Sequence, residues 1–389
     1  MSWRALFKFE LRAIFTNQSL LFTVFGGVLI YSFLYPQPYI KQLPREQQIV
    51  VVNLDNTQLS RQLVRMVDAT PQVKVAAHAG ALAEAKTMIN AGEVQGLLLI
   101  PDHFNRDLLM GKSPTLAYAG DAAYFLVYGT IVEGLANAGG TMGAQAKVAR
   151  MVMGGENLEL AADHYTAIKL NAQPVFNPTM GYINYVVPAV FVLILHQTLL
   201  IAVALLGGGQ GEYYRAGHTG YWVQYPAWRV LLVRGICFTL IYIPLLMYYF
   251  GFSFEYYGIS RLASIYHLVL IAVPFLLAVI FLGMIVGQLI PRRELATVVV
   301  LLSSLPLVFS AGFIWPVEMI PDGIVALAQL APSTPAINAF LRLNQMGAEF
   351  NQVIGWWGQL WVQTVVYGVI ATWLIVRVKR RGKTPIKLS

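Results

Sequence analysis

Residues 311–321, AGFIWPVEMIP, directly follow a long apolar run and place a glutamate between two prolines. The stretch after them is apolar enough to enter a membrane, but PSTP at 332–335 divides it into pieces of about two turns each. A membrane span needs about 20 apolar residues, so neither piece can cross alone. Irregular backbone at membrane depth must be sheltered by protein or line a water-filled cavity. The sequence therefore predicts a re-entrant helical segment over 316–350, beside a pore or under a lid.

The composition of the chain is that of a polytopic membrane protein. Of its 389 residues 57% are hydrophobic and only 12% are charged, whereas soluble domains carry about 25% charged residues. The formal net charge of +8 does not require a nucleic-acid partner, because lysines and arginines gather at the cytoplasmic ends of membrane spans. The single cysteine, Cys237, lies in an apolar run. It excludes an intrachain disulfide and a thiolate metal cluster, and we interpret it as a packed small side chain.

The N-terminus is predicted to lie in the headgroup layer before the chain first enters the membrane. Arg4, Lys8 and Arg12 are spaced four apart, which places them on one face of a helix, and apolar residues fill much of the rest. Residues 1–18 are therefore expected to form a basic amphipathic helix at the cytoplasmic surface. The first span, 19–35, is long and no small-residue cleavage site follows it. We interpret it as a retained signal anchor rather than a cleaved signal peptide.

Residues 36–180 have the pattern of a compact α/β domain inserted between the first two spans. Short apolar runs that end in turn residues, as buried strands do, alternate with segments of helical periodicity. The predicted elements are strands at 47–55, 94–102 and 113–121 and helices at 60–70, 81–92 and 122–167. The last helix contains the glycine pairs 139–140 and 154–155, which are candidate hinges.

Five further apolar runs in the membrane domain, 181–378, approach or exceed the length of a span. They are 182–206, 228–250, 262–290, 295–315 and 356–378. Basic residues flank the loop after the second span, close the fourth span in PRRE and form the tail 379–389. With six crossings these clusters share one side, which the positive-inside rule assigns to the cytoplasm, together with both termini. The predicted fold is a polytopic α-helical membrane protein with six transmembrane helices, an outer re-entrant helical hairpin and an inserted external α/β domain.

The amphipathic start and four further segments carry a resemblance to a known family. The four segments are VVVNLD (50–55), IPDHFNRDLLMGKSPTL (100–116), FNPTMGYINYVVPAVF (176–191) and SAGFIWPVEMIPDGIVALAQLAPSTPAINAFLRL (310–343). The last has the order G-x-x-x-P-x-E-x-x-P, then L-x-P-x-T-P, then a basic residue. The chain resembles the membrane subunit of ABC transporters of the ABC-2 (type V exporter) class, in the branch with a large external domain. The likeness covers nearly the whole length.

The resemblance implies partners and a place in the cell. The chain is expected in the bacterial inner membrane as a multi-pass permease subunit, with its large domain periplasmic. It is expected to bind a cytoplasmic ABC ATPase subunit, which holds the ATP and Mg²⁺, so this chain binds no cofactor itself. The second permease is either another copy or a paralogue, and a periplasmic adaptor protein is a frequent further partner. The implied activity is export of an amphiphile: a drug, a lipid or an envelope component.

The cytoplasmic loop 207–228 departs from the family pattern. It usually reads R-E-x-G-T-x-E before a proline and contacts the ATPase, whereas here the segment is GEYYRAGHTGYWVQYP (211–226). Gly217 is kept, but Arg215 stands where an acid is expected and Gly220 where the second acid is. The ATPase-coupling candidates are Glu212, Tyr213, Arg215, Gly217, His218, Thr219 and Pro226. The departure favours a partnership with a paralogous permease as much as a homodimer.

Two further groups of residues are candidates for the transport path. The gate candidates of the re-entrant segment are Gly312, Pro316, Glu318, Pro321, Pro332, Pro335 and Arg342. Glu318 either caps the re-entrant helix, whose N-terminus favours negative charge, or gates the path. His196 and Gln197, in the middle of the second span, either line the path or bond to a neighbouring helix. Tyr185, at the predicted interface, is a candidate contact for an amphiphile.

The sequence argues against an enzyme. MGKSP contains the end of a P-loop, but Arg106 stands where the first glycine is required, so energy must come from a separate subunit or from an ion gradient. His78, His103 and His164 are scattered without metal spacing. Two alternatives to an ABC permease remain open: a gradient-driven transporter or channel, and a scaffold that docks an envelope partner.

Overall fold

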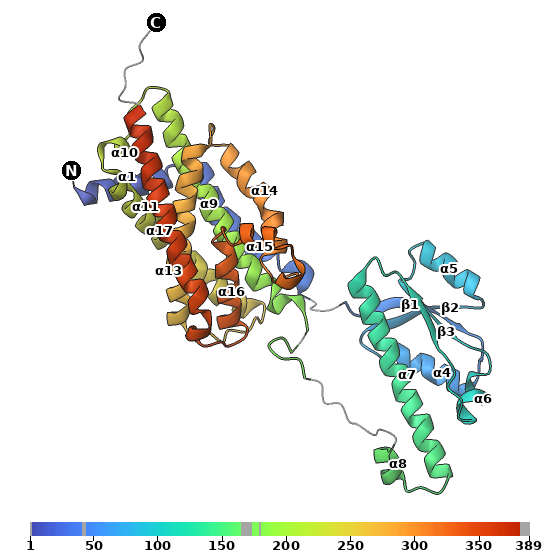
Figure 1. Cartoon of the computed structure of the whole chain (residues 1–389). Helices are drawn as coiled ribbons and strands as arrows, with labels where there is room; N and C mark the ends of the chain where they lie inside the picture. Colours follow the sequence, from blue (N-terminus) through green and yellow to red (C-terminus); the bar gives the residue numbers. More distant parts are fainter. Residues whose placement is uncertain (1, 41–43, 165–172, 179, 382–389) are drawn as a thin grey trace. The chain divides into compact units, whose positions relative to one another are not determined.

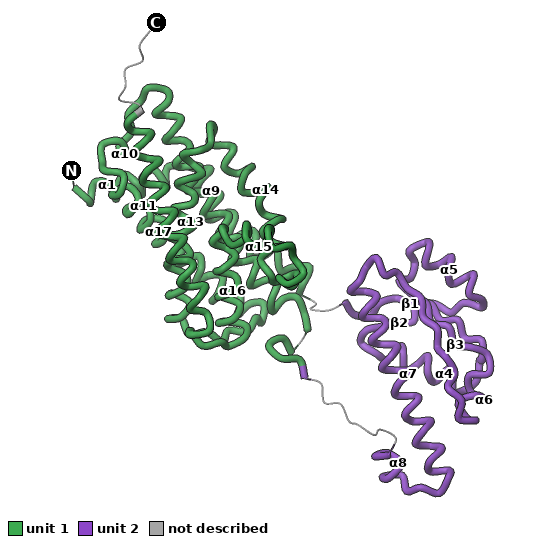
Figure 2. The backbone as a smooth tube through the Cα atoms, viewed as in Figure 1, with its two compact units in different colours: residues 1–40, 174–389 green, residues 41–173 purple. Residues whose placement is uncertain are grey.

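The structure is a computed structural model that describes residues 2–40, 44–164, 173–178 and 180–381. Backbone contacts divide the chain into two compact units, Met1–Ile40 with Pro174–Ser389 and Lys41–Gln173. Figure 2 shows these in green and purple. The first is a helical unit and the second is an α/β unit, and each is described by itself.

The helical unit is a bundle of long apolar helices with a helix at its N-terminal end that lies outside the spans (Figure 1). Its elements are α1 Trp3–Phe15, α2 Gln18–Leu21, η1 Phe22–Gly26, α3 Gly27–Leu34, η2 Gln37–Tyr39, η3 Tyr182–Asn184, α9 Val186–Arg215, α10 Tyr221–Gln224, α11 Ala227–Met247, η4 Tyr248–Ser253, α12 Phe254–Tyr256, α13 Ile265–Leu289, α14 Leu295–Ser310, η5 Val317–Met319, α15 Asp322–Ala328, α16 Ser333–Asn344 and α17 Phe350–Arg381. The first span is continuous through α2, η1 and α3, and the third through α11, η4 and α12.

Within the described residues, five helices are long and apolar enough to cross a membrane, or six if the bent pair α15–α16 counts as one span. The expected fifth span, 295–315, is shorter than the sequence suggested. The helix α14 has 16 residues, which rise about 24 Å against a hydrocarbon core of about 30 Å. Gly312 has a φ of 85° and stops the helix, although the apolar composition continues to Trp315.

The centre of the bundle is α9 packed against α13. Gly283 and Gly287 stand one turn apart on α13, and both face α9. A Cβ atom on Gly287 would lie 2.8 Å from the carbonyl oxygen of Ala204, and one on Gly283 would lie 2.9 Å from Cβ of Val203. This small-xxx-small spacing lets two backbones approach closely, which is how helices associate in lipid.

The bent pair α15–α16 turns by 86° at its break. The start of α16, from Pro332 to Pro335, is buried by protein, whereas Leu330 within the break is 62% exposed. The carbonyl groups left free at the break are satisfied by side chains. The Thr334 hydroxyl donates to Ala328 O at 2.8 Å, and Gln359 and Gln363 of α17 both donate to Gln329 O, at 3.1 and 2.7 Å.

The α/β unit is a four-stranded sheet covered on both faces. Its elements are β1 Gln47–Asn53, α4 Gln58–Asp68, β2 Val73–Ala79, α5 Leu82–Asn90, β3 Gly96–Ile100, α6 Phe104–Leu109, β4 Ala117–Gly120, α7 Phe125–Met153 and α8 Leu158–His164. The strand order is β2-β1-β3-β4; β1 pairs in parallel with β2 and β3, and β4 is antiparallel to β3. The apolar cores on the two faces include Leu63 and Ile131, from α4 and α7, and Ala85, from α5.

Two expectations for this unit require correction. The strand β2 was not predicted, because VKVAAHA carries alanine, lysine and histidine and alternates buried and exposed side chains, as an edge strand does. The pair Gly139–Gly140 does not hinge the last helix, since α7 runs through it to Met153. The second pair, Gly154–Gly155, does end α7, and Gly155 has a φ of 94°. Part of the helical prediction, residues 165–172, lies outside the described residues.

Candidate functional site

A buried ion pair joins α1 to α11. The guanidinium of Arg234 donates two hydrogen bonds to the Glu10 carboxylate, at 3.1 Å from Nε and 2.8 Å from Nη2. The two side chains are 2% and 0% exposed. Isolated charges at such depth are very unfavourable, so each group depends on the other for charge compensation. The pair therefore fixes α1, which comes before the first span, to the interior of the bundle.

The pair belongs to a polar network that reaches two further helices. Arg234 also donates to the Gln210 side-chain oxygen of α9 at 2.8 Å, and the Gln210 amide donates to the Tyr221 hydroxyl of α10 at 3.0 Å. Burial, and after it the nearby Glu10 carboxylate, raises the pKa of the Tyr221 phenol. Tyr221 is thus a neutral hydrogen-bonding group at physiological pH. Four helices meet at this network: α1, α9, α10 and α11.

The short helix α10 is held on several sides. Phe9 of α1 stacks on Tyr221 with ring centroids 5.5 Å apart. Tyr214 at the end of α9 meets Trp222 edge-on at 5.4 Å. The Lys379 ammonium of α17 donates to Tyr225 O at 2.6 Å and lies 5.9 Å from the Trp222 ring. A displacement of α10 would therefore be transmitted to α1, α9 and α17 at once.

The predicted coupling loop 207–228 starts later than expected, because α9 continues as helix to Arg215. The helix ends at Gly217, whose φ is 85°, with His218 N donating to Tyr213 O at 3.2 Å. These are the left-handed glycine and the long bond of a Schellman motif. Glu212 accepts from Arg293 N at 2.7 Å, and Arg215 donates to Pro291 O at 2.6 Å.

These bonds join the coupling loop 207–228 to residues 291–294, PRRE. Two of the basic clusters that the sequence places on the same side of the membrane therefore lie together in the helical unit. The contacts of Lys379 with Tyr225 and of Arg229 with Trp3, at 5.2 Å, bring both terminal helices to this same end of the helical unit (Figure 1). Among the coupling candidates, Glu212 is half-buried, and the exposed ones are Tyr213, Arg215, Gly217, His218, Thr219 and Pro226. We call this end, with α10 at its surface, the α10 end.

Most of the predicted gate residues lie between α14 and α15 or at the break of the bent pair. Gly312 ends α14, Pro316 precedes η5, and Pro321 and Pro332 are the N-caps of α15 and α16. Pro335 lies in the first turn of α16 and is buried.

The two charged gate candidates lie apart. Glu318 is exposed in η5, and the acid in the first turn of α15 is Asp322, so the capping interpretation of Glu318 is wrong. Arg342 has its guanidinium 4.8 Å from the centre of the Trp356 ring, so a cation–π contact orients it.

The three path candidates have different environments. The Gln197 amide donates to the Ser304 hydroxyl at 2.7 Å, which ties α9 to α14. His196 is 1% exposed, and neither ring nitrogen has a hydrogen-bond partner among the described residues. Tyr185 begins α9 and continues an aromatic series from Tyr39 through Tyr182, with centroids 5.9 and 5.7 Å apart. Burial raises the pKa of Tyr182 and Tyr185, and neighbouring tyrosines add to it.

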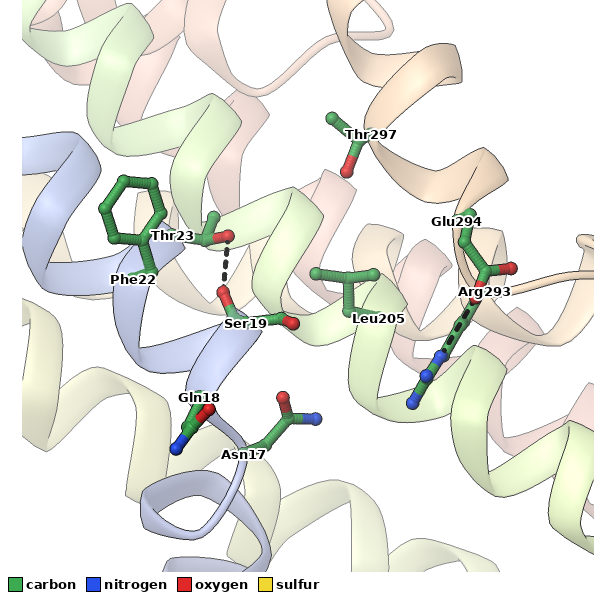
Figure 3. Close-up of a pocket in the computed structure, with 9 residues that line it drawn as sticks. All are labelled: Asn17, Gln18, Ser19, Phe22, Thr23, Leu205, Arg293, Glu294 and Thr297. Atoms are coloured by element: carbon green, nitrogen blue, oxygen red, sulfur yellow. Dashed lines mark hydrogen bonds and ion pairs between the residues drawn. The ribbon is translucent and has the colours of Figure 1, made fainter.

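A pocket of about 550 Å³ opens at the α10 end, between the start of the first span, α9 and the start of α14 (Figure 3). Its lining is Asn17, Gln18, Ser19, Phe22, Thr23, Leu205, Arg293, Glu294 and Thr297. Arg293 Nε donates to Glu294 at 3.1 Å. Glu294's own backbone N–H and then Arg293 lower the pKa of that carboxyl, which keeps it charged. The pocket thus combines two opposite charges and several hydroxyl and amide groups with one exposed ring, Phe22.

The histidines of the α/β unit form no metal site within the described residues, where no three histidine, cysteine, aspartate or glutamate side chains gather. His78 lies on β2, His103 precedes α6, and His164 contacts Glu156 at 2.5 Å.

Glu10, the acidic partner of Arg234 in the buried ion pair, was not among the residues predicted from the sequence. Its signal was present, because Leu6, Glu10 and Ile14 are spaced four apart and form the buried stripe of α1.

The long apolar helices, the bent pair and the inserted sheet together define a polytopic α-helical membrane protein. The family described as ABC-2 family transporter protein matches residues 18–373. The chain belongs to this family, so it is a membrane protein of the kind that generally forms part of ABC transporters, and the resemblance to ABC-2 transporters is confirmed. No curated protein matches the sequence.

Proposed function

We propose that the chain is the permease subunit of an ATP-driven exporter that moves an amphiphile outward. The observation that supports this most is the network of Glu10, Arg234, Gln210 and Tyr221, which joins an N-terminal amphipathic helix and the short helix α10 to the interior of two spans. Such a junction suits a subunit that receives a mechanical input at its surface and passes it into the bundle.

The input would come from a separate ABC ATPase subunit, which binds ATP and Mg²⁺. The ATPase would contact α10 and the exposed part of the coupling segment, including Tyr213, His218 and Thr219. Closure of two ATPase subunits on ATP would press on α10. Because α10 contacts α1, α9 and α17 through the pairs described above, the movement would reach several spans together.

The α10 end is then cytoplasmic and the α/β unit is periplasmic, in a bacterial inner membrane. The basic exposed face of α1, with Arg4, Lys8 and Arg12, supports this orientation, since anionic headgroups attract it. A second permease, either a copy of this chain or a paralogue, would complete the transporter, and a periplasmic adaptor is a further proposed partner.

The pocket at the α10 end supports an amphiphilic substrate. Arg293, Glu294 and the hydroxyl groups suit a polar headgroup, and Phe22, which is 69% exposed, suits an apolar tail beside it. An amphiphile would be taken up here from the inner leaflet and released beyond the bent pair, where the start of α16 is buried by protein.

Co-purification tests the proposal. The chain, tagged at its C-terminus and expressed in its own host, is purified in a mild detergent, and bound proteins are identified by mass spectrometry. We expect a protein with a P-loop and ATPase activity in equal amount to the permeases. His218→Asp should weaken its retention relative to His103→Asp, which makes the same substitution at an exposed position of the α/β unit. Purification of the chain with no ATPase in any detergent tested would contradict the proposal.

A further inference from the structure

The α/β unit contains a pocket that the transport role does not explain. Its volume is about 620 Å³, and it lies where β1 and β2 end and α4 begins. The lining residues are Val51, Asn53, Leu54, Asn56, Arg61, Val64, Arg65, His78, Ala79 and Gly80. All of them belong to the α/β unit.

The charge of this pocket is positive. Arg61 and Arg65 project from α4 one turn apart, His78 comes from β2, and no aspartate or glutamate is among the described lining residues. Two like charges at this helical spacing repel each other and disfavour the helix. An anion held between them would relieve the repulsion, so their position favours a ligand rather than a purely structural role.

The two arginines are placed differently. Arg61 Nη1 donates to Asn56 O, which directs its guanidinium toward the turn after β1. Arg65 is exposed and makes no hydrogen bond or ion pair with the part of the chain that the structure describes. The nearby acids are already engaged: Asp55 accepts from the Thr57 hydroxyl and Asn105 N, and Asp68 accepts from Val75 N at 2.8 Å.

The topology of the sheet supports a binding role at this edge. The carboxyl ends of the parallel strands β1 and β2 lie side by side here, so residues at both strand ends can contact one ligand. The N-terminus of α4, an 11-residue helix, also points its positive dipole end to this edge. The floor of the pocket is apolar, because Val51 and Ala79 are buried. A ligand here would place an anionic group on the arginines and a less polar part on the floor.

We propose that the α/β unit binds a phosphate monoester in this pocket, with Arg61 and Arg65 as the residues that hold the phosphate. The planar guanidinium donates paired hydrogen bonds to phosphate oxygens, which makes arginine the better residue for this purpose than lysine. The phosphate comes either from a soluble ester or from the headgroup of a lipid. The proposal does not depend on the transport function.

The test is a binding titration with the full chain in detergent. Two probes carry the same phosphate monoester: glycerol 3-phosphate, which is soluble, and dihexanoyl phosphatidic acid, which is a short lipid. Binding is followed by the broadening of the probe's ³¹P NMR line at constant ionic strength. We expect broadening with at least one probe, and a Kd at least about tenfold weaker in Arg61→Gln and in Arg65→Gln, because hydrogen bonds between charged groups are the strong ones.

Arg45→Gln is the matched control. Arg45 is exposed just before β1, at the opposite end of the same strand, so the substitution removes the same charge from the same unit. The control should bind as the unmodified chain does, and circular dichroism checks that all variants fold. Binding of the lipid probe alone supports a headgroup as the ligand, and binding of both supports a soluble ester. The proposal is overturned if neither probe binds, if Arg45→Gln loses as much affinity as the pocket variants, or if acetate displaces the phosphate at equal concentration.

Discussion

Glu10 and Arg234 are 224 residues apart in the sequence and form a doubly hydrogen-bonded ion pair that water does not reach. The pair is the reason that α1 is part of the bundle and not only a helix adsorbed to the membrane surface. Leu6 and Ile14, on the same stripe, are also fully buried. The N-terminal helix, the coupling segment and the third span thereby form one mechanical unit.

Removing only one charge of the ion pair should lower the free energy of unfolding more than removing both charges. Glu10→Leu or Arg234→Met leaves the other charge buried and unpaired, which costs about 3–5 kcal/mol. We expect a clearly lower midpoint of thermal unfolding in detergent for each single variant. The double variant Glu10→Leu/Arg234→Met should recover most of the loss, because apolar side chains of similar volume replace both charges.

Lys8→Leu is the control for this series, since Lys8 is exposed on α1 and should leave the midpoint nearly unchanged. If the double variant unfolds as easily as the worse single variant, the two charges do not compensate each other and the buried pair does not stabilise the junction.

The same double variant tests whether the network transmits movement from α10 to the spans or only stabilises the fold. It keeps the packing of α1 on α11 but removes the hydrogen bonds from Arg234 to Gln210, and so the link to Tyr221 on α10. With the ATPase subunit bound, we expect ATP hydrolysis to respond less to an amphiphilic substrate, while basal hydrolysis and the amount of bound ATPase stay unchanged. An unchanged response would mean that the network only holds the helices in place.

The close contact of α13 with α9 gives a prediction about packing. Gly287→Ala would place a methyl group 2.8 Å from Ala204 O and 3.1 Å from Gly208 N, both backbone atoms. Overpacking of this kind costs about 1–3 kcal/mol, so the unfolding midpoint should fall. Gly251→Ala is the control, because no heavy atom lies within 4 Å of the added carbon. Equal midpoints for the two variants would show that the helices can separate freely.

The proposed orientation can be tested by labelling single cysteines. In a Cys237→Ser background, Lys112→Cys marks the α/β unit and His218→Cys marks the α10 end, and both positions are exposed. A membrane-impermeant maleimide added to intact cells from which the outer membrane has been removed should label Lys112→Cys only. Both should react once the inner membrane is opened. Labelling of His218→Cys in the intact cells would place the α10 end outside and contradict the orientation.

Much of the architecture follows from local sequence signals. Runs of apolar residues locate the spans, and PSTP locates the start of α16, because proline has no backbone N–H to donate and is tolerated in the first turn of a helix. The length of α14 was overestimated since composition alone does not reveal that Gly312 adopts a left-handed conformation. The strand β2 was missed because an edge strand needs few apolar residues.

The pairing of Glu10 with Arg234 could not be predicted from local sequence patterns. Arg234 is one of the basic residues that flank the loop after the second span, and that pattern gives no sign that its side chain is buried. A charge becomes buried only when a partner far along the chain compensates it, and nothing near residue 234 identifies Glu10. The position of Glu10 in the apolar stripe of α1 was the available signal, and it indicates burial without naming the partner.

The central claim is that this chain receives its energy from an ATPase at the α10 end, and one measurement tests it most directly. The rate of ATP hydrolysis by the co-purified ATPase subunit is measured in lipid vesicles with and without the chain, at equal ATPase concentration. The account predicts faster hydrolysis with the chain present, and a smaller further increase on adding an amphiphilic substrate in Glu10→Leu/Arg234→Met than in the unmodified chain. A hydrolysis rate that is the same with and without the chain would contradict it.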